Sequence, residues 1–242
     1  MTLAPPAPPE APSDKRRYVR EMFADIAPRY DLLNHLLSLN VDRGWRRQAV
    51  DRLGWEARAG GVFLDACGGT LDLAAELAGR AAFAGTVVGA DFARPMLRLG
   101  AAKVRGRPIR AAAADTLGLP FRDGTFDGAT VGFGLRNLDD VDAGLRELAR
   151  VLRPGARLVI LDFTTPPRAA VRAAYLLYFR RILPLVGRLV SGHPTAYAYL
   201  PASVEQFPAP DALAGRMGGA GLKDCGFRLL TGGIAAIHWG TR

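Results

Sequence analysis

Residues 62–91 place glycine and acidic side chains in the order that a nucleotide-binding unit needs. An apolar run at 62–64 predicts a short buried strand, Gly68-Gly69 breaks it, and a helical pattern follows at 72–77. A second apolar run then ends at Asp91. Glycines let backbone N–H groups approach a ligand, and an acid about 20 residues further on can accept hydrogen bonds from both ribose hydroxyls. The stretch therefore predicts a nucleotide site; an ordinary turn with a solvated aspartate is the alternative.

The following residues supply strands that must hold this unit in place. Apolar runs predict strands at 109–114, 126–131 and 157–162, alternating with amphipathic helices, one of them capped by Asp139 or Asp140. This alternation predicts a parallel sheet with helices on both faces.

Two final strands are expected to close the sheet. They lie at 223–230 and 234–240, and Gly232-Gly233 between them is a tight-turn signal. A helix is expected just before them, at 211–219. The sequence thus predicts a closing hairpin at the end of an α/β fold.

The segments around this core differ in composition. Residues 15–27 carry apolar side chains at three- and four-residue spacing, which predicts an amphipathic helix. It opens a front piece, 15–54, expected either to cap the site or to form an outer helical layer. Between 163 and 207 the pattern changes, and 169–190 is apolar and aromatic but interrupted by arginines. We expect an apolar lid or an interfacial element there; a core helix is the alternative.

Composition limits the class of protein. The chain has 242 residues, 49% of them hydrophobic and 23% charged, which fits a single folded domain over 15–242 behind a disordered Pro/Ala-rich tail, 1–14. Two cysteines without metal-ligand spacing suggest reduced thiols in the cytoplasm. No metal site is expected, since His35 has no second ligand at metal spacing. No apolar run of about 18 residues is available to span a membrane.

The chain is strongly basic, with a net charge of +9 and a pI near 10.2. Such a charge suits nucleic acid, an anionic membrane surface or an arginine-rich proteome. The arginines are spread along the whole chain, which favours the last interpretation and argues against a nucleic-acid partner.

Several stretches resemble one family, the ubiquinone/menaquinone biosynthesis C-methyltransferases. They are Val19–Phe23 with Ile26–Asn34, Gly132-Phe133-Gly134-Leu135-Arg136-Asn137, Arg150–Gly155, Tyr199–Ser203 with Phe207-Pro208, and Gly232–Ala235. The resemblance covers about residues 18–240. It implies a Rossmann-like class I methyltransferase fold, with a seven-stranded, mostly parallel sheet and an antiparallel closing hairpin. It also implies S-adenosyl-L-methionine as the cofactor and a prenylated quinol, most specifically demethylmenaquinol, as the substrate.

The resemblance assigns cofactor contacts residue by residue. Asp91 would accept the ribose hydroxyls, Asp115 and Thr116 would contact the adenine, and Asp65 would lie near the amino group of the ligand. The other assigned positions are Gly68 and Thr70 in the glycine motif and Gly132, which offers only backbone where other members carry serine.

One residue departs from the family motif. Members usually have glycine after the threonine of the glycine motif, and this chain has Leu71. If this position needs a positive φ or approaches the cofactor, leucine is expected to strain or occlude the site and weaken cofactor binding. Leu71→Gly would then tighten it.

Catalysis of methyl transfer to carbon requires an electron-rich ring and stabilisation of the phenolate formed from it. Arg136 is the candidate for this stabilisation because it follows the fourth strand, at the edge where α/β sites form; a surface arginine is the alternative. Asn137 and Tyr30 are weaker candidates for orienting the ring. Because the substrate is dissolved in the membrane, the protein is expected in the cytoplasm, in peripheral contact with the anionic inner face of the membrane. The sequence does not decide the oligomeric state.

Three alternatives follow from the same residues. The first is a methyltransferase acting on another lipid or aromatic small molecule. The second is a nucleic-acid binder or RNA methyltransferase, which the scattered arginines argue against. The third is a cofactor-binding protein whose activity is reduced by Leu71.

Overall fold

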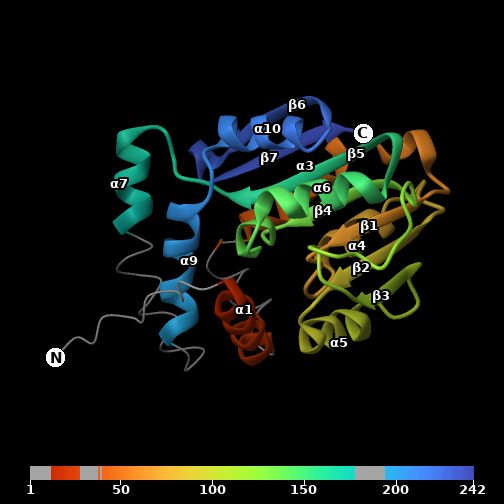
Figure 1. Cartoon of the computed structure of the whole chain (residues 1–242), viewed down its shortest axis with the longest axis horizontal. Helices are drawn as coiled ribbons and strands as arrows, with labels where there is room; N and C mark the ends of the chain where they lie inside the picture. The colour runs from red at the N-terminus through yellow and green to blue at the C-terminus, as the bar shows by residue number, and fades with distance from the viewer. Residues whose placement is uncertain (1–11, 28–37, 39, 178–193) are drawn as a thin grey trace.

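A seven-stranded sheet crosses the protein in the order β3-β2-β1-β4-β5-β7-β6 (Figure 1). The computed structural model describes residues 12–27, 38, 40–177 and 194–242. Strands β1 to β5 pair in parallel, whereas β7 runs antiparallel to β5 and to β6. The strands are β1 (Val62–Ala66), β2 (Thr86–Asp91), β3 (Ile109–Ala113), β4 (Phe126–Gly132), β5 (Leu152–Phe163), β6 (Lys223–Leu230) and β7 (Ala235–Thr241). The predicted α/β class, with its antiparallel closing hairpin, is confirmed.

Helices cover both faces of the sheet, as the alternation predicts. Leucine, valine and aromatic side chains of one helical layer pack on one face around Trp45 and Phe63. A second set, including Leu145, Leu148 and Met217, packs on the other face. The first layer contains α3 (Val41–Leu53), α4 (Asp72–Ala78) and α5 (Arg94–Lys103), and the second contains α6 (Val141–Val151) and α10 (Pro210–Gly219).

Local signals in the sequence explain some of the helix and strand ends. The Asp140 carboxylate caps α6 by accepting a hydrogen bond from the Ala143 amide at 2.9 Å, so the second of the two predicted caps is used. The strand predicted at 157–162 begins earlier, at Leu152, and so includes Arg153-Pro154-Gly155; Leu152 pairs with Phe126 across a register shift. In the closing hairpin, Gly232 and Gly233 both have positive φ, as a tight turn requires.

Three helices lie together beyond the carboxyl ends of the parallel strands (Figure 1). They are α1 (Pro12–Ile26), α7 (Ala169–Leu177) and α9 (Pro194–Gln206). Their apolar side chains meet in a cluster of Val19, Met22, Tyr175 and Tyr199. Helix α9 is not predicted from the sequence, because Pro201 interrupts its pattern. The helices of the front piece, 15–54, therefore have different positions. Helix α1 lies at the carboxyl edge of the sheet, whereas α3 packs on one face of the sheet.

Some predicted segments lie outside the described residues. These are the tail up to residue 11, the segment 28–37 with Tyr30 and His35, and the part of the apolar stretch between 178 and 193.

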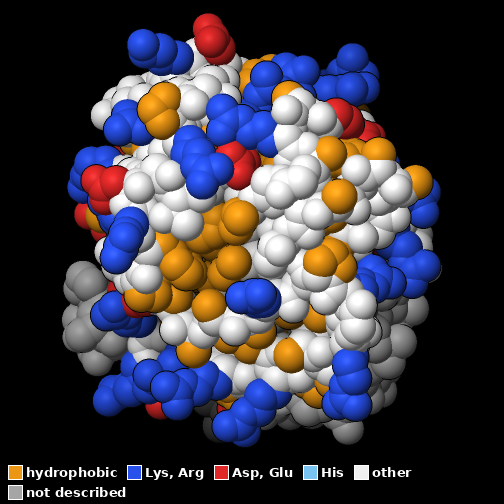
Figure 2. All heavy atoms as spheres, turned by 90° about the vertical axis from the view of Figure 1, so that its right-hand side faces the viewer, with side chains coloured by type: hydrophobic (Ala, Val, Ile, Leu, Met, Phe, Trp, Pro, Cys, Tyr) orange, Lys and Arg blue, Asp and Glu red, His pale blue; other side chains and the backbone are white. Residues whose placement is uncertain are grey.

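Within the described part of the chain, none of the helices is both long enough and apolar enough to cross a membrane. The face at the amino ends of the parallel strands carries Lys and Arg side chains scattered around hydrophobic groups, without one continuous basic patch (Figure 2). This distribution agrees with the scattered arginines of the sequence.

Candidate active site

Two adjoining pockets open at the carboxyl edge of the parallel strands. The larger has a volume of about 680 Å³ and the smaller about 350 Å³. Both are lined by Cys67, Gly69, Gly132 and Phe133, so they form one continuous cleft.

The loop between β1 and α4 forms the floor of the cleft. Cys67, Gly69 and Leu71 have positive φ values of 50°, 52° and 66°, which turn the chain sharply back toward the sheet. The amide of Gly68 donates to the carbonyl of Ala90 at 2.9 Å and ties the loop to β2. Gly68 and Thr70, for which cofactor contacts are expected from the family resemblance, both line the smaller pocket.

Leu71 is expected to strain the backbone or to occlude the site, and the structure shows the strain but not the occlusion. Its φ of 66° is the strained, left-handed conformation that favours glycine. Its side chain is fully buried, however, and lines neither pocket. It packs between β2 and α5, where a Cβ on Gly89 would lie 2.2 Å from Leu71 Cδ2 and a Cβ on Gly100 2.8 Å from Leu71 Cγ. The expected occlusion is therefore wrong, because two glycines give the leucine room in the core.

Leu71→Gly is consequently expected to destabilise the protein instead of improving the site. Loss of a buried leucine side chain costs about 2–5 kcal/mol, and relief of the left-handed strain returns only about 1–2 kcal/mol. Urea denaturation of both proteins measures the difference. Gly89→Ala serves as the coupled test: it should cost less stability in the Leu71→Gly background, where its methyl group meets no leucine. Strictly additive effects would contradict this packing.

Asp91 lies at the end of β2 and lines the larger pocket. Its Oδ2 accepts a hydrogen bond from the Gly69 amide at 2.8 Å, and its Oδ1 accepts one from the Ala93 amide at 2.7 Å. Burial raises the pKa of this carboxyl, and the backbone hydrogen bonds partly oppose that shift. Each carboxylate oxygen has a second lone pair, so Asp91 can hold the glycine loop and still accept from a ligand.

Asp65, at the end of β1, lines the smaller pocket and is almost completely buried. It accepts hydrogen bonds from the Thr130 hydroxyl and the Ala74 amide, both at 3.0 Å. Burial raises its pKa to about 7. A cation beside this carboxyl would favour its ionised form.

The loop after β3 brings Asp115 and Thr116 to the larger pocket. The Leu117 amide donates to Asp115 Oδ1 at 2.9 Å, and the Cys67 Sγ lies 3.3 Å from the Thr116 hydroxyl. Helix α1 reaches the same point, because Arg16 pairs with Asp115 Oδ2. The predicted adenine loop is thereby joined to both the glycine loop and α1.

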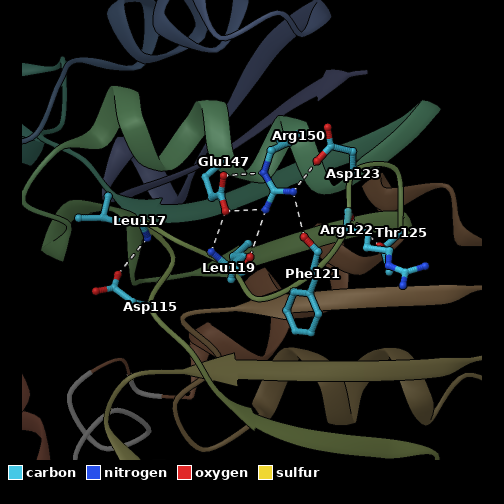
Figure 3. Close-up of polar contacts among 9 residues, drawn as sticks. All are labelled: Asp115, Leu117, Leu119, Phe121, Arg122, Asp123, Thr125, Glu147 and Arg150. Carbon is cyan, nitrogen blue, oxygen red and sulfur yellow. Dashed lines mark hydrogen bonds and ion pairs between the residues drawn. The ribbon is translucent and has the colours of Figure 1, made fainter.

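Two residues of α6 hold the remainder of that loop (Figure 3). Arg150 donates to the carbonyl of Phe121 at 2.9 Å and to that of Leu119 at 3.1 Å. Glu147 pairs with Arg150 and accepts from the Leu119 amide at 2.7 Å. Arg150 lies in a stretch quoted for the family resemblance, and its structural role is to fix the backbone that follows Asp115.

The end of β4 places Gly132 in both pockets and Asn137 in the larger one. A Cβ on Gly132 would lie 2.6 Å from Leu73 Cδ1, so glycine here gives space to a leucine of α4. Asn137 Oδ1 accepts a hydrogen bond from the Tyr199 hydroxyl at 3.2 Å, which connects it to α9.

Arg136 is not a surface arginine, and it does not line either pocket. Its guanidinium is buried against Asp162 at the end of β5, with 2.6 Å between Nη1 and Oδ1, and also donates to the carbonyl of Phe133. The guanidinium carbon lies 5.4 Å from the centroid of the Phe163 ring.

Four residues in or beside the cleft are not found by reasoning from the sequence. Arg46 and Asp72 line the smaller pocket, and Asp162 and Tyr199 contact Arg136 and Asn137 from outside both pockets. None of the four gave a motif signal of its own, although Tyr199 stands in a family stretch. In the part of the chain that the structure describes, no group of three or more histidine, cysteine or acidic side chains is placed to hold a metal ion.

The cleft suits an adenosylated amino acid. Asp91 offers acceptors for a ribose, polar side chains line the larger pocket, and acids line the smaller one. Its position outside the carboxyl ends of parallel strands is where ligands bind in this class of sheet. A SAM-dependent methyltransferase from Aquifex aeolicus aligns with 81% of this chain and 88% of its own, with a TM-score of 0.58 and 18% identity. The [4+2]-cyclase SpnF aligns over 100% of this chain and 99% of its own, with a TM-score of 0.62 and 15% identity. These structures show the fold alone.

Fold, site and sequence together define an S-adenosylmethionine-dependent methyltransferase with a Rossmann-like fold. Residues 11–242 match the family model described as the ubiE/COQ5 methyltransferase family, and the chain belongs to that family. A demethylmenaquinone methyltransferase of Thermus thermophilus is 53% identical over 91% of this chain and 100% of its own length. A protein of the same name from Deinococcus radiodurans is 47% identical over 95% of this chain and 94% of its own. The ubiquinone/menaquinone biosynthesis C-methyltransferase UbiE of Geobacter sulfurreducens is 44% identical over 95% and 90%.

Proposed function

We propose that the chain methylates a ring carbon of a prenylated quinol, converting demethylmenaquinol to menaquinol. The observation that carries the proposal is the position of Phe133, which lines both pockets and packs against Phe163 with a centroid distance of 4.8 Å and an interplanar angle of 35°. An aromatic wall at the junction of the pockets suits a flat ring that must meet the methyl donor. The relatives in Thermus and Deinococcus are named for the same substrate.

S-adenosylmethionine supplies, when bound, an electrophilic methyl group on a sulfonium, so the protein mainly has to place the ring in line with it. We assign Asn137, in the larger pocket, to orienting a ring hydroxyl, and Tyr30 to the same task. Arg136 lines neither pocket but donates to the carbonyl of Phe133 in the pocket wall. We assign its cation to stabilising, without touching the ring, the negative charge that gathers as the ring hydroxyl loses a proton. Asp162 holds the guanidinium in place. Burial raises the pKa of Tyr199 to about 12 and raises that of Tyr175 still further, so neither tyrosine is assigned as a general base.

The apolar cluster between α1, α7 and α9 is the proposed contact for the prenyl tail. It contains Val19, Met22, Tyr175 and Tyr199. The two tyrosines belong to the 163–207 segment, which we interpret as a lid. Each CH₂ buried there contributes about 0.8 kcal/mol. Methyl transfer to another lipid or aromatic small molecule is the second candidate, and the same apolar wall supports it. The alternative of a protein weakened by Leu71 loses one of its two grounds, because that side chain lies outside the pockets, and keeps the other, the left-handed backbone at Leu71.

The test is a methyl-transfer assay with a reduced demethylmenaquinone analogue, compared with catechol-type and non-prenylated rings. Transfer to carbon of the prenylated quinol, lost when the quinone is left oxidised, is the expected result. Faster transfer to a non-prenylated ring would favour the second candidate.

Cofactor affinity should depend on pH through Asp65. Its pKa is about 7 without ligand, and the positively charged amino group of the ligand favours the carboxylate. Affinity for S-adenosylhomocysteine is therefore expected to rise with pH, by up to tenfold per pH unit below the pKa, and to level off above it. Calorimetry in matched buffers measures this, with Asp65→Asn as the pH-independent control. A flat profile in the parent protein would remove Asp65 from the amino-group site.

Peripheral binding to anionic membranes is also proposed, since the substrate is dissolved there. Flotation with anionic liposomes should show binding that weakens with salt. Arg168→Ser/Arg172→Ser, at the apolar segment, should weaken it more than Arg122→Ser/Arg146→Ser, which removes equal charge from exposed positions elsewhere. Equal effects, or no binding at low salt, would reject this surface.

A further inference from the structure

The smaller pocket is lined by a positively charged side chain to which the proposed function gives no role. Arg46, on α3, lines this pocket together with Asp65 and Asp72. Among the described residues lining it, Arg46 is the one positive side chain. Residue 46 is only 7% exposed, so its charge is held inside the protein at the floor of the cleft.

The guanidinium of Arg46 is fixed from three directions. One terminal nitrogen pairs with Asp42 one turn earlier on α3, and Nη2 lies 3.2 Å from Asp72 Oδ2 at the start of α4. The guanidinium carbon lies 5.7 Å from the centroid of the Phe133 ring. Asp42 is itself held by the Ser38 hydroxyl at 2.6 Å. This arrangement orients the group before any ligand arrives, which lowers the cost of ordering it on binding.

The charges of the smaller pocket match those of an α-amino acid. An amino acid carries a carboxylate and an ammonium, and this pocket offers one guanidinium and two carboxyl groups, Asp65 and Asp72. The guanidinium has five N–H donors, more than its two acidic neighbours among the described residues engage, and its planar fork fits a carboxylate. Asp91 and Asp115, the expected contacts of the ribose and the adenine, line the larger pocket, and with the adenosine portion there the amino-acid portion would extend into the smaller one.

We infer that Arg46 binds the carboxylate of the amino-acid portion of S-adenosylmethionine. The inference depends on the cofactor and on the proposed placement of its adenosine portion, but not on the quinol. Its role is distinct from that of a residue that only supports the fold, because it discriminates between ligands with and without that carboxylate.

Calorimetry with two ligands tests the inference. S-adenosylhomocysteine carries the amino-acid portion, and 5′-methylthioadenosine lacks it. Arg46→Met should weaken binding of the first by about 10- to 100-fold, in line with loss of a charge-assisted hydrogen bond, and leave the second within twofold. Arg46→Lys should recover part of the loss, since it keeps the charge without the fork. Arg47→Met, which removes the exposed neighbouring arginine, should bind both ligands like the parent.

Equal weakening of both ligands would show that Arg46 only supports the fold, and unchanged binding of S-adenosylhomocysteine would also overturn the inference. If Arg46→Met does not fold, the test is made with the parent protein and a changed ligand. The carboxamide form of S-adenosylhomocysteine should bind to it at least tenfold more weakly than the acid. Equal binding of the two forms would reject the carboxylate contact. No quinol is present in these experiments. Failure of the proposed substrate would therefore appear in the methyl-transfer assay and leave this result unchanged.

Discussion

Asp91→Ala is expected to abolish measurable binding of S-adenosylhomocysteine while the protein stays folded. The change removes the proposed acceptor of two ribose hydroxyls, each charge-assisted hydrogen bond being worth about 1.5–3 kcal/mol. Together these correspond to a loss of roughly 10²- to 10⁴-fold in affinity. The same change frees the Gly69 amide, which donates to Asp91 Oδ2, so the glycine loop also loses its anchor.

Calorimetry measures the affinity, and circular dichroism with thermal unfolding confirms that the variant is folded. Asp91→Asn is expected to bind almost as poorly, because an amide NH₂ would face one of the two backbone N–H groups that the carboxylate now accepts. Asp211→Ala, which removes an exposed aspartate from α10, is the matched control and should bind like the parent. Affinity within twofold of the parent for Asp91→Ala would remove Asp91 from the site.

The sequence is informative where backbone pattern and function coincide. The end of a strand is marked in the sequence by an apolar run that stops at a polar residue. This signal alone predicts that Asp65, Asp91 and Asp115 lie at the carboxyl edge of the parallel sheet. The parallel arrangement brings those ends to one edge of the sheet, and the structure places all three in one cleft.

It is less informative where contacts join distant segments. From the sequence Leu71 is expected to occlude the cofactor site, because the glycines that accommodate its side chain, Gly89 and Gly100, are 18 and 29 residues away in the chain. In the sequence Arg46 is one of many scattered arginines. Only the packing of α3 beside α4 in the structure brings it to Asp72. Asp162 ends an apolar strand like several other acids, and only the sheet order shows that it faces Arg136. Side-chain pairing of this kind leaves no periodic signal.

Arg136→Ala is expected to lower turnover about 10²- to 10³-fold at saturating cofactor, the usual cost of removing a preorganised charge-stabilising donor. The nucleotide is proposed to be held after β1, β2 and β3, whereas Arg136 follows β4, so cofactor affinity should stay within threefold. Arg136→Lys should recover only part of the rate, because it lacks the planar guanidinium. Rates with a reduced demethylmenaquinone analogue, together with calorimetry for cofactor, separate the two effects.

The buried pair with Asp162 calls for a second variant, since removing only the arginine leaves a buried carboxylate unpaired at a cost of about 3–5 kcal/mol. Arg136→Met/Asp162→Leu removes both charges and is expected to recover much of that stability, because apolar side chains often replace a buried ion pair without loss. If the Arg136 cation stabilises the reacting ring, the double variant regains stability and not turnover. If turnover returns with stability, or if Arg136→Ala keeps its rate within threefold of the parent, the guanidinium has only a structural role at the end of β4.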